Sequence, residues 1–549
     1  MNYKILFLLT SLIALSYACS PTYDYDVIIR NGIIYDGSGS KPYAGDIALK
    51  GDKIAAIGKL GEATGETEID VEGLAVSPGF INMLSWATET LIQDGRSQSD
   101  IRQGVTLEVM GEGTSMGPLT EEMKRIEKEN QNLITYDIEW TTLGEYLKFL
   151  EDKGVSTNIA SFIGNGTLRE YAVGLEDTKP TEEQMQLMKD LVKQAMEEGA
   201  IGLSSSLLYV PSIYSNTNEL IELAKVAAAY DGMYISHIRN EGPRLLESVN
   251  ELITIAREAT ISAEIYHLKA SGKENWNKLD SAINLVEAAQ DEGLHITADM
   301  YNYPASSTGL NVILPQWVKD GGHEATMTRF KDPILRQKAI DEVLFTCSPD
   351  STLLVGFKSE HMRNHIGKSV GDVARERNIS PQQAVVDLIE EDNSRVSAVY
   401  FTMSPNNLNK KVALPWLSFC SDAGSYSAEG IFLKVGTHPR SYGSFARLFR
   451  KFVREDQVIS IEEAVRKLTS LPATNMKIKQ RGFLKEGYYG DIVVFDPASI
   501  ADHSTFINPH QYATGVEHVW VNGIQVLNHG EHTGATPGRF VKGPGWKED

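Results

Sequence analysis

Cysteine is almost absent from this chain. Only Cys19, Cys347 and Cys420 occur in 549 residues, and no two of them form a C-x-x-C pair. A disulfide framework or a cysteine-rich zinc module needs several closely spaced cysteines, so neither builds this fold. Cys420 precedes Asp422 by two residues, so on a strand the two side chains would lie on the same face. It is expected either to face the inside of the fold near Asp422 or, as the more common alternative, to be a small buried apolar residue.

Basic residues are also scarce relative to acidic ones. The chain has 52 lysines and arginines against 73 acidic residues, a formal net charge of −21. Such a chain repels phosphate backbones, which argues against nucleic-acid binding. Beyond the N-terminus no apolar run approaches the roughly 18 residues expected of a membrane-spanning helix.

The first residues have the composition of a targeting segment. Lys4 supplies a positive start, residues 5–15 form a short apolar stretch, and small residues precede Cys19. Residues 1–18 are therefore predicted to be a signal peptide, and Cys19 stands where a bacterial lipoprotein carries its lipid. Ser16 occupies a position where such signals usually hold leucine, so ordinary signal-peptide cleavage is the alternative. Either way we expect export to a bacterial envelope, as a periplasmic protein or as a lipoprotein tethered to the membrane through Cys19.

The two ends of the mature chain have similar compositions. Residues 19–75 and 480–549 contain short alternating apolar runs separated by glycine turns, for example 27–32 and 491–496. This pattern is typical of small β-sheets. We expect both ends to build one β-sandwich beside the central domain.

Between these ends, residues 76–479 alternate strand-like and helix-like segments. Parallel strands need helical crossovers, and eight such units close a barrel. The sequence therefore predicts an α/β fold, a (β/α)8 TIM-like barrel, with an insertion at about 302–405 before the last strand that covers part of the site. The eight expected strands are 79–83, 105–110, 158–162, 200–203, 233–236, 263–266, 295–299 and 417–419.

Polar side chains stand where several of these strands end. His237 and His267 each close a β-branched run, and Asp422 follows the last strand. Barrel enzymes hold metal ligands and catalytic groups at this end of the strands. A lone histidine there is more often hydrogen-bonded structure, and Asp422 could cap its loop, but two histidines in consecutive units beside an acid favour a metal site.

Several motifs together resemble the N-acyl-D-amino-acid deacylases of the amidohydrolase superfamily. The resemblance spans nearly all of the mature chain, and it is specific because the motifs recur in order. The motifs occupy residues 78–81, 234–241, 267–276, 298–310, 421–422, 438–443 and 469–473. The resemblance implies a zinc-dependent hydrolase that acts on a small-molecule N-acyl-D-amino acid and releases a carboxylic acid and a free D-amino acid.

Residue types agree with the roles that the resemblance implies. Histidines are suitable zinc ligands, a carboxylate beside the metal can act as general acid and base, and a guanidinium binds a carboxylate through two hydrogen bonds. The structural alternatives are that Arg440 braces the barrel mouth and that Lys269 is merely exposed. The implied roles are metal ligation by His237 and His267, proton transfer by Asp422, and substrate binding by Arg440, Lys269, Tyr209 and Tyr301.

The chain departs from the family in its metal motifs. Where the superfamily has His-x-His after the first strand, this chain has Leu84 and Trp86, which do not coordinate metals. Where the deacylases have a cysteine ligand, it has Gly113, preceded by Glu112. We therefore expect one Zn²⁺ per chain, held by Glu112, His237 and His267.

Two of these assignments keep alternatives. Glu112 could be a solvated or arginine-paired turn residue, and Glu108 could replace it as ligand or could pair with Arg102. For function, the same barrel could cleave another amide, such as a cyclic amide or a dipeptide with a D-residue, or could bind small amides without catalysis. The sequence makes no prediction about the oligomeric state.

Overall fold

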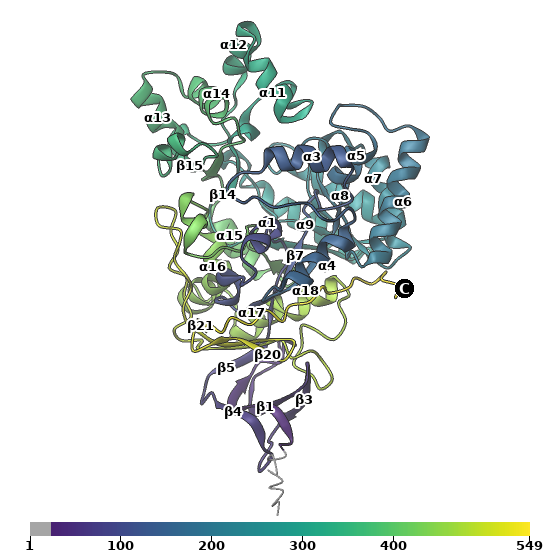
Figure 1. Cartoon of the computed structure of the whole chain (residues 1–549), viewed down its shortest axis with the longest axis vertical. Helices are drawn as coiled ribbons and strands as arrows, with labels where there is room; N and C mark the ends of the chain where they lie inside the picture. The colour runs from purple at the N-terminus through teal and green to yellow at the C-terminus, as the bar shows by residue number, and fades with distance from the viewer. Residues whose placement is uncertain (1–22, 549) are drawn as a thin grey trace, which may run out of the picture.

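The computed structural model describes residues 23–548. The predicted signal peptide and Cys19 lie outside these residues. A β-sheet lies at one end of the molecule, a barrel with its helices fills the middle, and a mostly helical lobe that contains α11 to α14 lies at the other end (Figure 1).

Strands from both ends of the chain share a single nine-stranded sheet. Its strand order is β21-β20-β19-β18-β5-β1-β2-β3, and β4 pairs with the first part of β1, on the same edge that β5 pairs with farther along. Apolar residues that alternate along these strands form a separate core, which includes Ile47, Val76 and Trp520. The strands are β1 (Tyr25–Ile34), β2 (Tyr43–Lys50), β3 (Lys53–Gly58), β4 (Gly65–Asp70), β5 (Ala75–Pro78), β18 (Ile492–Phe495), β19 (Val516–Val521), β20 (Ile524–Asn528) and β21 (Glu531–His532).

The predicted α/β barrel is confirmed. Its strands are parallel, and the ring closes where Met83 N donates to Phe419 O at 3.4 Å and Ser85 bridges Ala423. Strand β10 begins two residues later than expected, at Gly202, and continues through serines that resemble a loop in sequence. The barrel strands are β6 (Phe80–Asn82), β7 (Val105–Met110), β8 (Asn158–Ser161) with its continuation β9 (Ile163–Gly164), β10 (Gly202–Ser206), β11 (Met233–His237), β12 (Ser262–Ile265), β13 (Ile296–Met300) and β17 (Leu417–Phe419).

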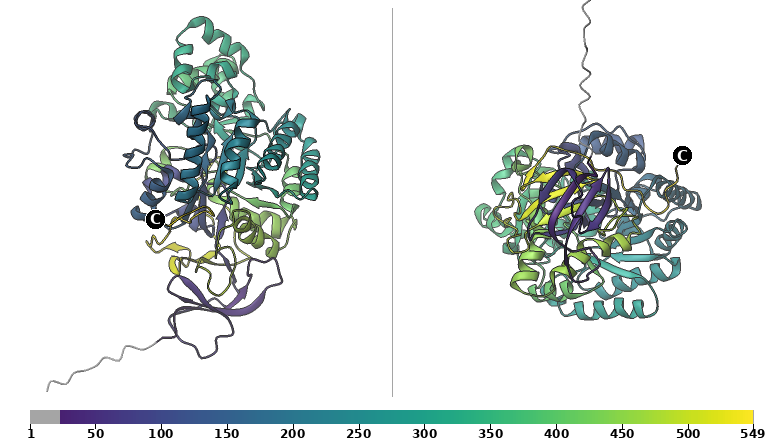
Figure 2. Two further views of the ribbon diagram at one scale, coloured as in Figure 1. Left: turned by 90° about the vertical axis from the view of Figure 1, so that its right-hand side faces the viewer. Right: turned by 90° about the horizontal axis from the view of Figure 1, so that it is seen from below.

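Helices surround the barrel (Figure 2). Apolar residues recur at three-to-four spacing in the longer helices, so each of these buries one face. Capping boxes start two of them, at Thr142 and Thr181. Among residues 23–548 no helix is both long and apolar enough to cross a bilayer. The helices are α1 (Thr88–Gln93), α2 (Gln98–Ile101), α3 (Glu121–Asn130), α4 (Leu143–Lys153), α5 (Asn165–Ala172), α6 (Glu182–Glu198), α7 (Thr217–Ala228), α8 (Leu245–Ala259), α9 (Lys278–Asp291), α15 (Pro405–Ala413), α16 (Arg440–Arg447), α17 (Ile461–Leu468) and α18 (Ser470–Asn475).

The segment between β13 and β17 forms a lobe with its own apolar core. A three-stranded sheet of order β14-β16-β15 joins this lobe to the barrel mouth. Residues 306–309, 355–358 and 393–397 of the lobe line the cavity that holds the candidate site. The elements of the lobe are β14 (Ser306–Gly309), α10 (Gln316–Lys319), α11 (Gly322–Phe330), α12 (Pro333–Glu342), β15 (Thr352–Gly356), α13 (Val370–Arg377), α14 (Pro381–Asp392) and β16 (Ser397–Tyr400).

Candidate metal and substrate site

A cavity of about 870 Å³ opens at the C-terminal ends of the barrel strands. Loops that follow the strands form its floor, and the lobe between β13 and β17 supplies part of its wall. The structure brings every site residue expected from the sequence into this one cavity. They are Glu112, Tyr209, His237, His267, Lys269, Tyr301, Asp422 and Arg440.

Three of these side chains converge. Glu112 follows β7, His237 ends β11, and His267 follows β12. Glu112 Oε1 lies 3.0 Å from His237 Nδ1 and 2.8 Å from His267 Nε2. One candidate ligand atom from each residue lies within 4.8 Å of the other two, and all three residues are buried. Two imidazole nitrogens and a carboxylate oxygen form a ligand set that zinc accepts.

The backbone around Glu112 explains why the neighbouring position is glycine. Gly111 and Gly113 have φ values of +99° and +69°, a conformation that favours glycine. A Cβ on Gly113 would lie 2.2 Å from Ser206 Cβ. A cysteine cannot fit at 113 without moving β10, and the turn instead directs Glu112 toward the two histidines.

The charges of these three residues fit a divalent cation. Burial and the Lys269 ammonium disfavour charge on His267, but Glu112 and Glu241 outweigh them and raise the pKa of His267 to about 10. Burial opposes ionisation of Glu112, yet the two imidazoles hold its pKa below the ordinary value. A metal ion that replaced the imidazole protons would satisfy the same nitrogen and oxygen atoms. Metal binding should therefore release protons and strengthen as the pH rises.

Glu108, the alternative ligand, lies apart from the histidines. Its carboxylate accepts hydrogen bonds from Ser85 Oγ at 2.7 Å and from Thr157 Oγ1 at 2.9 Å. Arg102, its other expected partner, instead forms an ion pair of 2.8 Å with Glu531. The geometry thus favours Glu112 over Glu108 as the third ligand.

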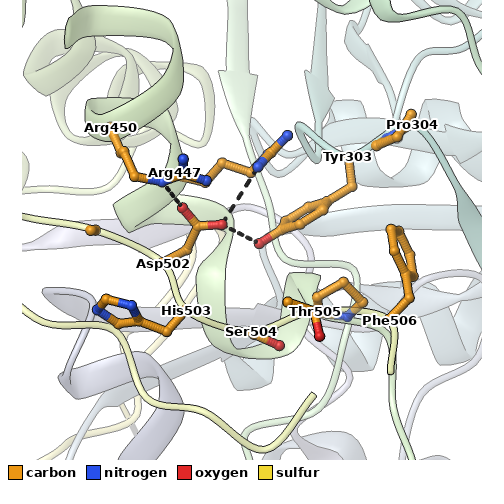
Figure 3. A pocket seen from close by; sticks show the side chains of 11 residues that line it. Tyr303, Pro304, Arg447, Arg450, Asp502, His503, Ser504, Thr505 and Phe506 are labelled. Carbon is orange, nitrogen blue, oxygen red and sulfur yellow. Dashed lines mark hydrogen bonds and ion pairs between the residues drawn. The ribbon is translucent and has the colours of Figure 1, made fainter. Parts of the chain in front are cut away.

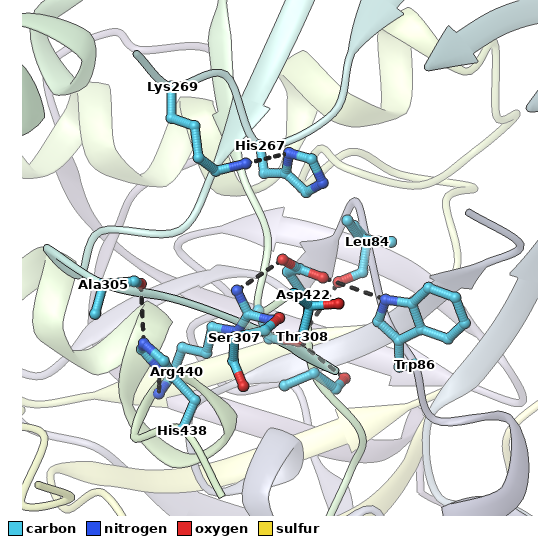
Figure 4. A network of polar contacts seen from close by, with 12 residues as sticks. Leu84, Trp86, His267, Lys269, Ala305, Ser307, Thr308, Asp422, His438 and Arg440 are labelled. Atoms are coloured by element: carbon cyan, nitrogen blue, oxygen red, sulfur yellow. Dashed lines mark hydrogen bonds and ion pairs between the residues drawn. The ribbon is translucent and has the colours of Figure 1, made fainter. Parts of the chain in front are cut away.

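Asp422 lies beside the three candidate ligands, in the loop after β17. Its N–H donates to Leu84 O at 2.9 Å, and its φ of +49° is strained for a residue with a side chain. Oδ2 lies 2.7 Å from Arg440 Nη1, and Oδ1 accepts from Trp86 Nε1 at 3.2 Å (Figure 4). Within residues 23–548 no backbone N–H donates to this carboxylate, which argues against a loop cap. Burial raises the pKa of Asp422 although Arg440 opposes the shift, and a carboxyl group with a raised pKa is suited to proton transfer.

Arg440, at the start of α16, reaches the same cavity. Nη2 donates to Ser307 O at 3.3 Å, and the guanidinium lies 4.4 Å from the centre of the Tyr301 ring. Nε and Nη1 are buried and have no aligned hydrogen-bond acceptor among residues 23–548, in spite of the ion pair with Asp422. The Tyr301 hydroxyl is buried without a partner in the same part of the chain. Buried donors without acceptors are costly, and a ligand carboxylate would satisfy them.

His438 fixes the start of the Arg440 helix. Its Nδ1 accepts from Arg440 N at 2.9 Å, and its Nε2 lies 3.0 Å from Ala305 O (Figure 4). Burial holds the pKa of His438 well below its usual range, so the ring stays neutral and can accept through one nitrogen while it donates through the other.

Lys269 and Tyr209 each contact a neighbour in the cavity wall. Lys269 Nζ lies 2.5 Å from Glu241 Oε1 and 2.7 Å from His267 Nδ1. Tyr209 packs edge-on against His237, and its hydroxyl lies 2.9 Å from Thr308 Oγ1. Both therefore line the cavity while they also hold a histidine or a loop in place.

Sequence reasoning gave Glu241 no role. Its Oε1 lies 3.1 Å from His267 Nδ1, the ring nitrogen that faces away from Glu112. A carboxylate in this place orients a ligating histidine and fixes which nitrogen carries the proton. The only signal in the sequence was its position four residues after His237, in the same loop.

A second cavity, of about 590 Å³, lies between Tyr303, α16 and residues 501–506 (Figure 3). Its arginines are already neutralised. Asp502 accepts from Arg450 Nε at 2.6 Å and from the Tyr303 hydroxyl at 3.2 Å, and it lies 3.5 Å from Arg447 Nη1. This cavity therefore offers a packed ion pair and not a reaction site.

Known proteins resemble this chain in sequence and fold. Residues 436–527 match the model of the Amidohydrolase family. The solved structure of N-acyl-D-glutamate deacylase from Bordetella bronchiseptica, in complex with zinc and a phosphonate inhibitor that mimics the tetrahedral intermediate, is 27% identical, with a TM-score of 0.79 over 94% of this chain and 99% of that chain. A structure of D-aminoacylase, concerned with its binuclear metal centre, activation by one metal and attenuation by the second, is 28% identical, with a TM-score of 0.80 over 94% of this chain and 100% of that one.

The sequence similarity also extends over most of the chain. D-aminoacylase of Alcaligenes xylosoxydans xylosoxydans is 30% identical over 528 residues, which is 95% of this chain and 98% of the relative. Since the sequence matches over 95% of this chain and the fold over 94% of it, the chain belongs to the D-aminoacylase family of amidohydrolases.

Proposed function

We propose that this protein is a single-zinc hydrolase that cleaves the amide bond of N-acyl-D-amino acids. One observation carries the proposal: the Glu112, His237 and His267 cluster, the Asp422 carboxylate and the Arg440 guanidinium lie in one cavity. A metal-ligand set, a proton acceptor and a carboxylate receptor are the three parts that hydrolysis of such a substrate requires. The D-configuration of the substrate is inferred from the relatives.

In this proposal the side chains have separate tasks. Glu112, His237 and His267 would hold the zinc, which when bound supplies a Lewis acid for the scissile carbonyl and makes water more acidic. Arg440 and the Tyr301 hydroxyl bind the α-carboxylate and so fix the substrate in the cavity. Asp422 accepts a proton from the attacking water and returns it to the leaving nitrogen.

A matched panel of substrates tests this function. Purified protein with one equivalent of zinc should release free amino acid from N-acetyl-D-amino acids at least about a hundredfold faster, in kcat/KM, than from the L-enantiomers. Inversion at the α-carbon misplaces either the carboxylate or the amide, and a lost charged hydrogen bond costs about 1.5–3 kcal/mol. Amino acid release is measured by chiral chromatography. Turnover of cyclic amides or L-substrates alone would refute the proposal.

The carboxylate receptor predicts a specific defect for Arg440→Lys. Lysine keeps the charge but loses the two-pronged hydrogen bonding, so KM for an N-acetyl-D-amino acid should rise by about 10- to 100-fold, and kcat should fall less. Steady-state kinetics check this split. The same substitution should not lower kcat/KM for the corresponding N-acetyl-D-amino acid amide, because that compound lacks the α-carboxylate that Arg440 binds.

Arg447→Lys is the matched control for this prediction. Arg447 lies on the same helix but faces the second cavity, beside Asp502. Its replacement should leave KM within about twofold of wild type, since it touches no part of the proposed receptor. An equal rise in KM for both variants would show a general effect on α16.

A further inference from the structure

We propose that Trp86 positions the general base of this enzyme and restricts the site to one metal. The inference rests on the proposed function, because it assigns Asp422 the proton-transfer role. It concerns a residue that departs from the metal motif of the superfamily.

The backbone places Trp86 firmly at the barrel mouth. Trp86 N donates to Ala423 O at 2.9 Å, and the preceding Ser85 N donates to Val109 O at 2.7 Å. The segment therefore joins the first strand to both the second and the last. Its position cannot shift without moving the loop that carries Asp422.

The indole N–H is shared between two carboxylates. Trp86 Nε1 lies 3.0 Å from Glu112 Oε2. It also lies 3.2 Å from Asp422 Oδ1 (Figure 4). Glu112 uses its other oxygen toward the two histidines, and Asp422 uses its other oxygen toward Arg440. The indole N–H therefore bridges Glu112 Oε2 and Asp422 Oδ1, the two oxygens that take no part in those other contacts.

This contact has two consequences. An indole N–H is a neutral donor, so it orients Asp422 without neutralising it, and the carboxylate stays available as a base. The ring also has no lone pair to offer a metal, and with Leu84 it replaces both positions of the expected His-x-His pair. Two facing carboxylate oxygens would otherwise attract a second cation.

Trp86→Phe removes the N–H and keeps most of the ring. Loss of this hydrogen bond should lower kcat by about tenfold, with KM within about twofold, because the α-carboxylate receptor is untouched. The variant should keep one zinc per chain, which separates mispositioning of Asp422 from damage to the metal ligands. Wild type should stay at one zinc when up to about ten equivalents are supplied, as measured by elemental analysis after desalting.

Trp317→Phe is the matched control. Trp317 Nε1 also donates to a carboxylate, Glu342 Oε2 at 2.6 Å, but within the lobe and away from the metal ligands. Its substitution should leave kcat and zinc content unchanged. A Trp86→Phe variant with wild-type kcat, or a second tightly bound zinc in the wild type, overturns the inference. The metal measurement needs no substrate, so it remains informative even if the substrate proposal fails.

Discussion

Asp422→Asn is expected to hydrolyse the substrate about a thousandfold more slowly than wild type while it keeps its zinc. Asparagine has the size of aspartate and can keep a hydrogen bond to Trp86, but it cannot accept and return a proton. General acid and base groups contribute about 10²- to 10⁴-fold to rates. Asp422 lies outside the three-residue cluster of candidate ligands, so metal content should not change.

The measurement compares kcat, KM and zinc per chain for this variant and for a control. Asp387→Asn removes a carboxylate that is also paired with an arginine, Arg336, but in the lobe far from the cavity ligands. It should retain wild-type kcat. If Asp422→Asn retained more than about a tenth of the wild-type kcat, Asp422 would not be the proton acceptor.

Loss of the metal is the second large effect, and Glu112→Gln should produce it. An uncharged amide is a poor zinc ligand, and the two histidines alone leave the set one ligand short. Zinc content should fall from about one per chain to below about 0.1, and activity should fall with it. Elemental analysis of the desalted protein gives the metal content independently of any substrate.

Glu108→Gln is the control that distinguishes Glu108, on β7, from Glu112, in the loop after β7, as the third metal ligand. Burial raises the pKa of Glu108, and its carboxylate accepts hydrogen bonds from two hydroxyl groups, so an amide is a close substitute for it. This variant should keep its zinc and its activity. Retention of zinc by Glu112→Gln together with loss by Glu108→Gln would reverse the assignment.

Much of the barrel was predictable because its signals are local. Buried parallel strands are short β-branched runs, and amphipathic helices follow them, so each unit is visible in a short window. His237 and His267 could be matched to each other because they end consecutive strands and therefore face the same mouth. Strand β10 was misplaced by two residues because Ser204 to Ser206 resemble a loop, although neighbouring strands bury them.

The contacts that could not be predicted join residues that are far apart in the sequence or belong to different strands, and no local sequence pattern contains this information. Glu241 reaches His267 from a loop after a different strand, and Trp86 meets Asp422 across the closure of the barrel. The sequence marked Trp86 only as a departure from a motif. Its two hydrogen bonds become visible only when the first and last strands are side by side.

The sheet that joins the two ends of the chain affects how the polypeptide is made. Strand β5 pairs on one edge with β1 and on the other with β18, with Val76 opposite Val494. A ribosome releases β5 long before it has synthesised β18, so that edge stays open while the whole barrel is translated. An open edge with apolar residues invites pairing with other nascent chains, and chaperones that bind such edges would therefore be of most use to this protein before its last strands emerge.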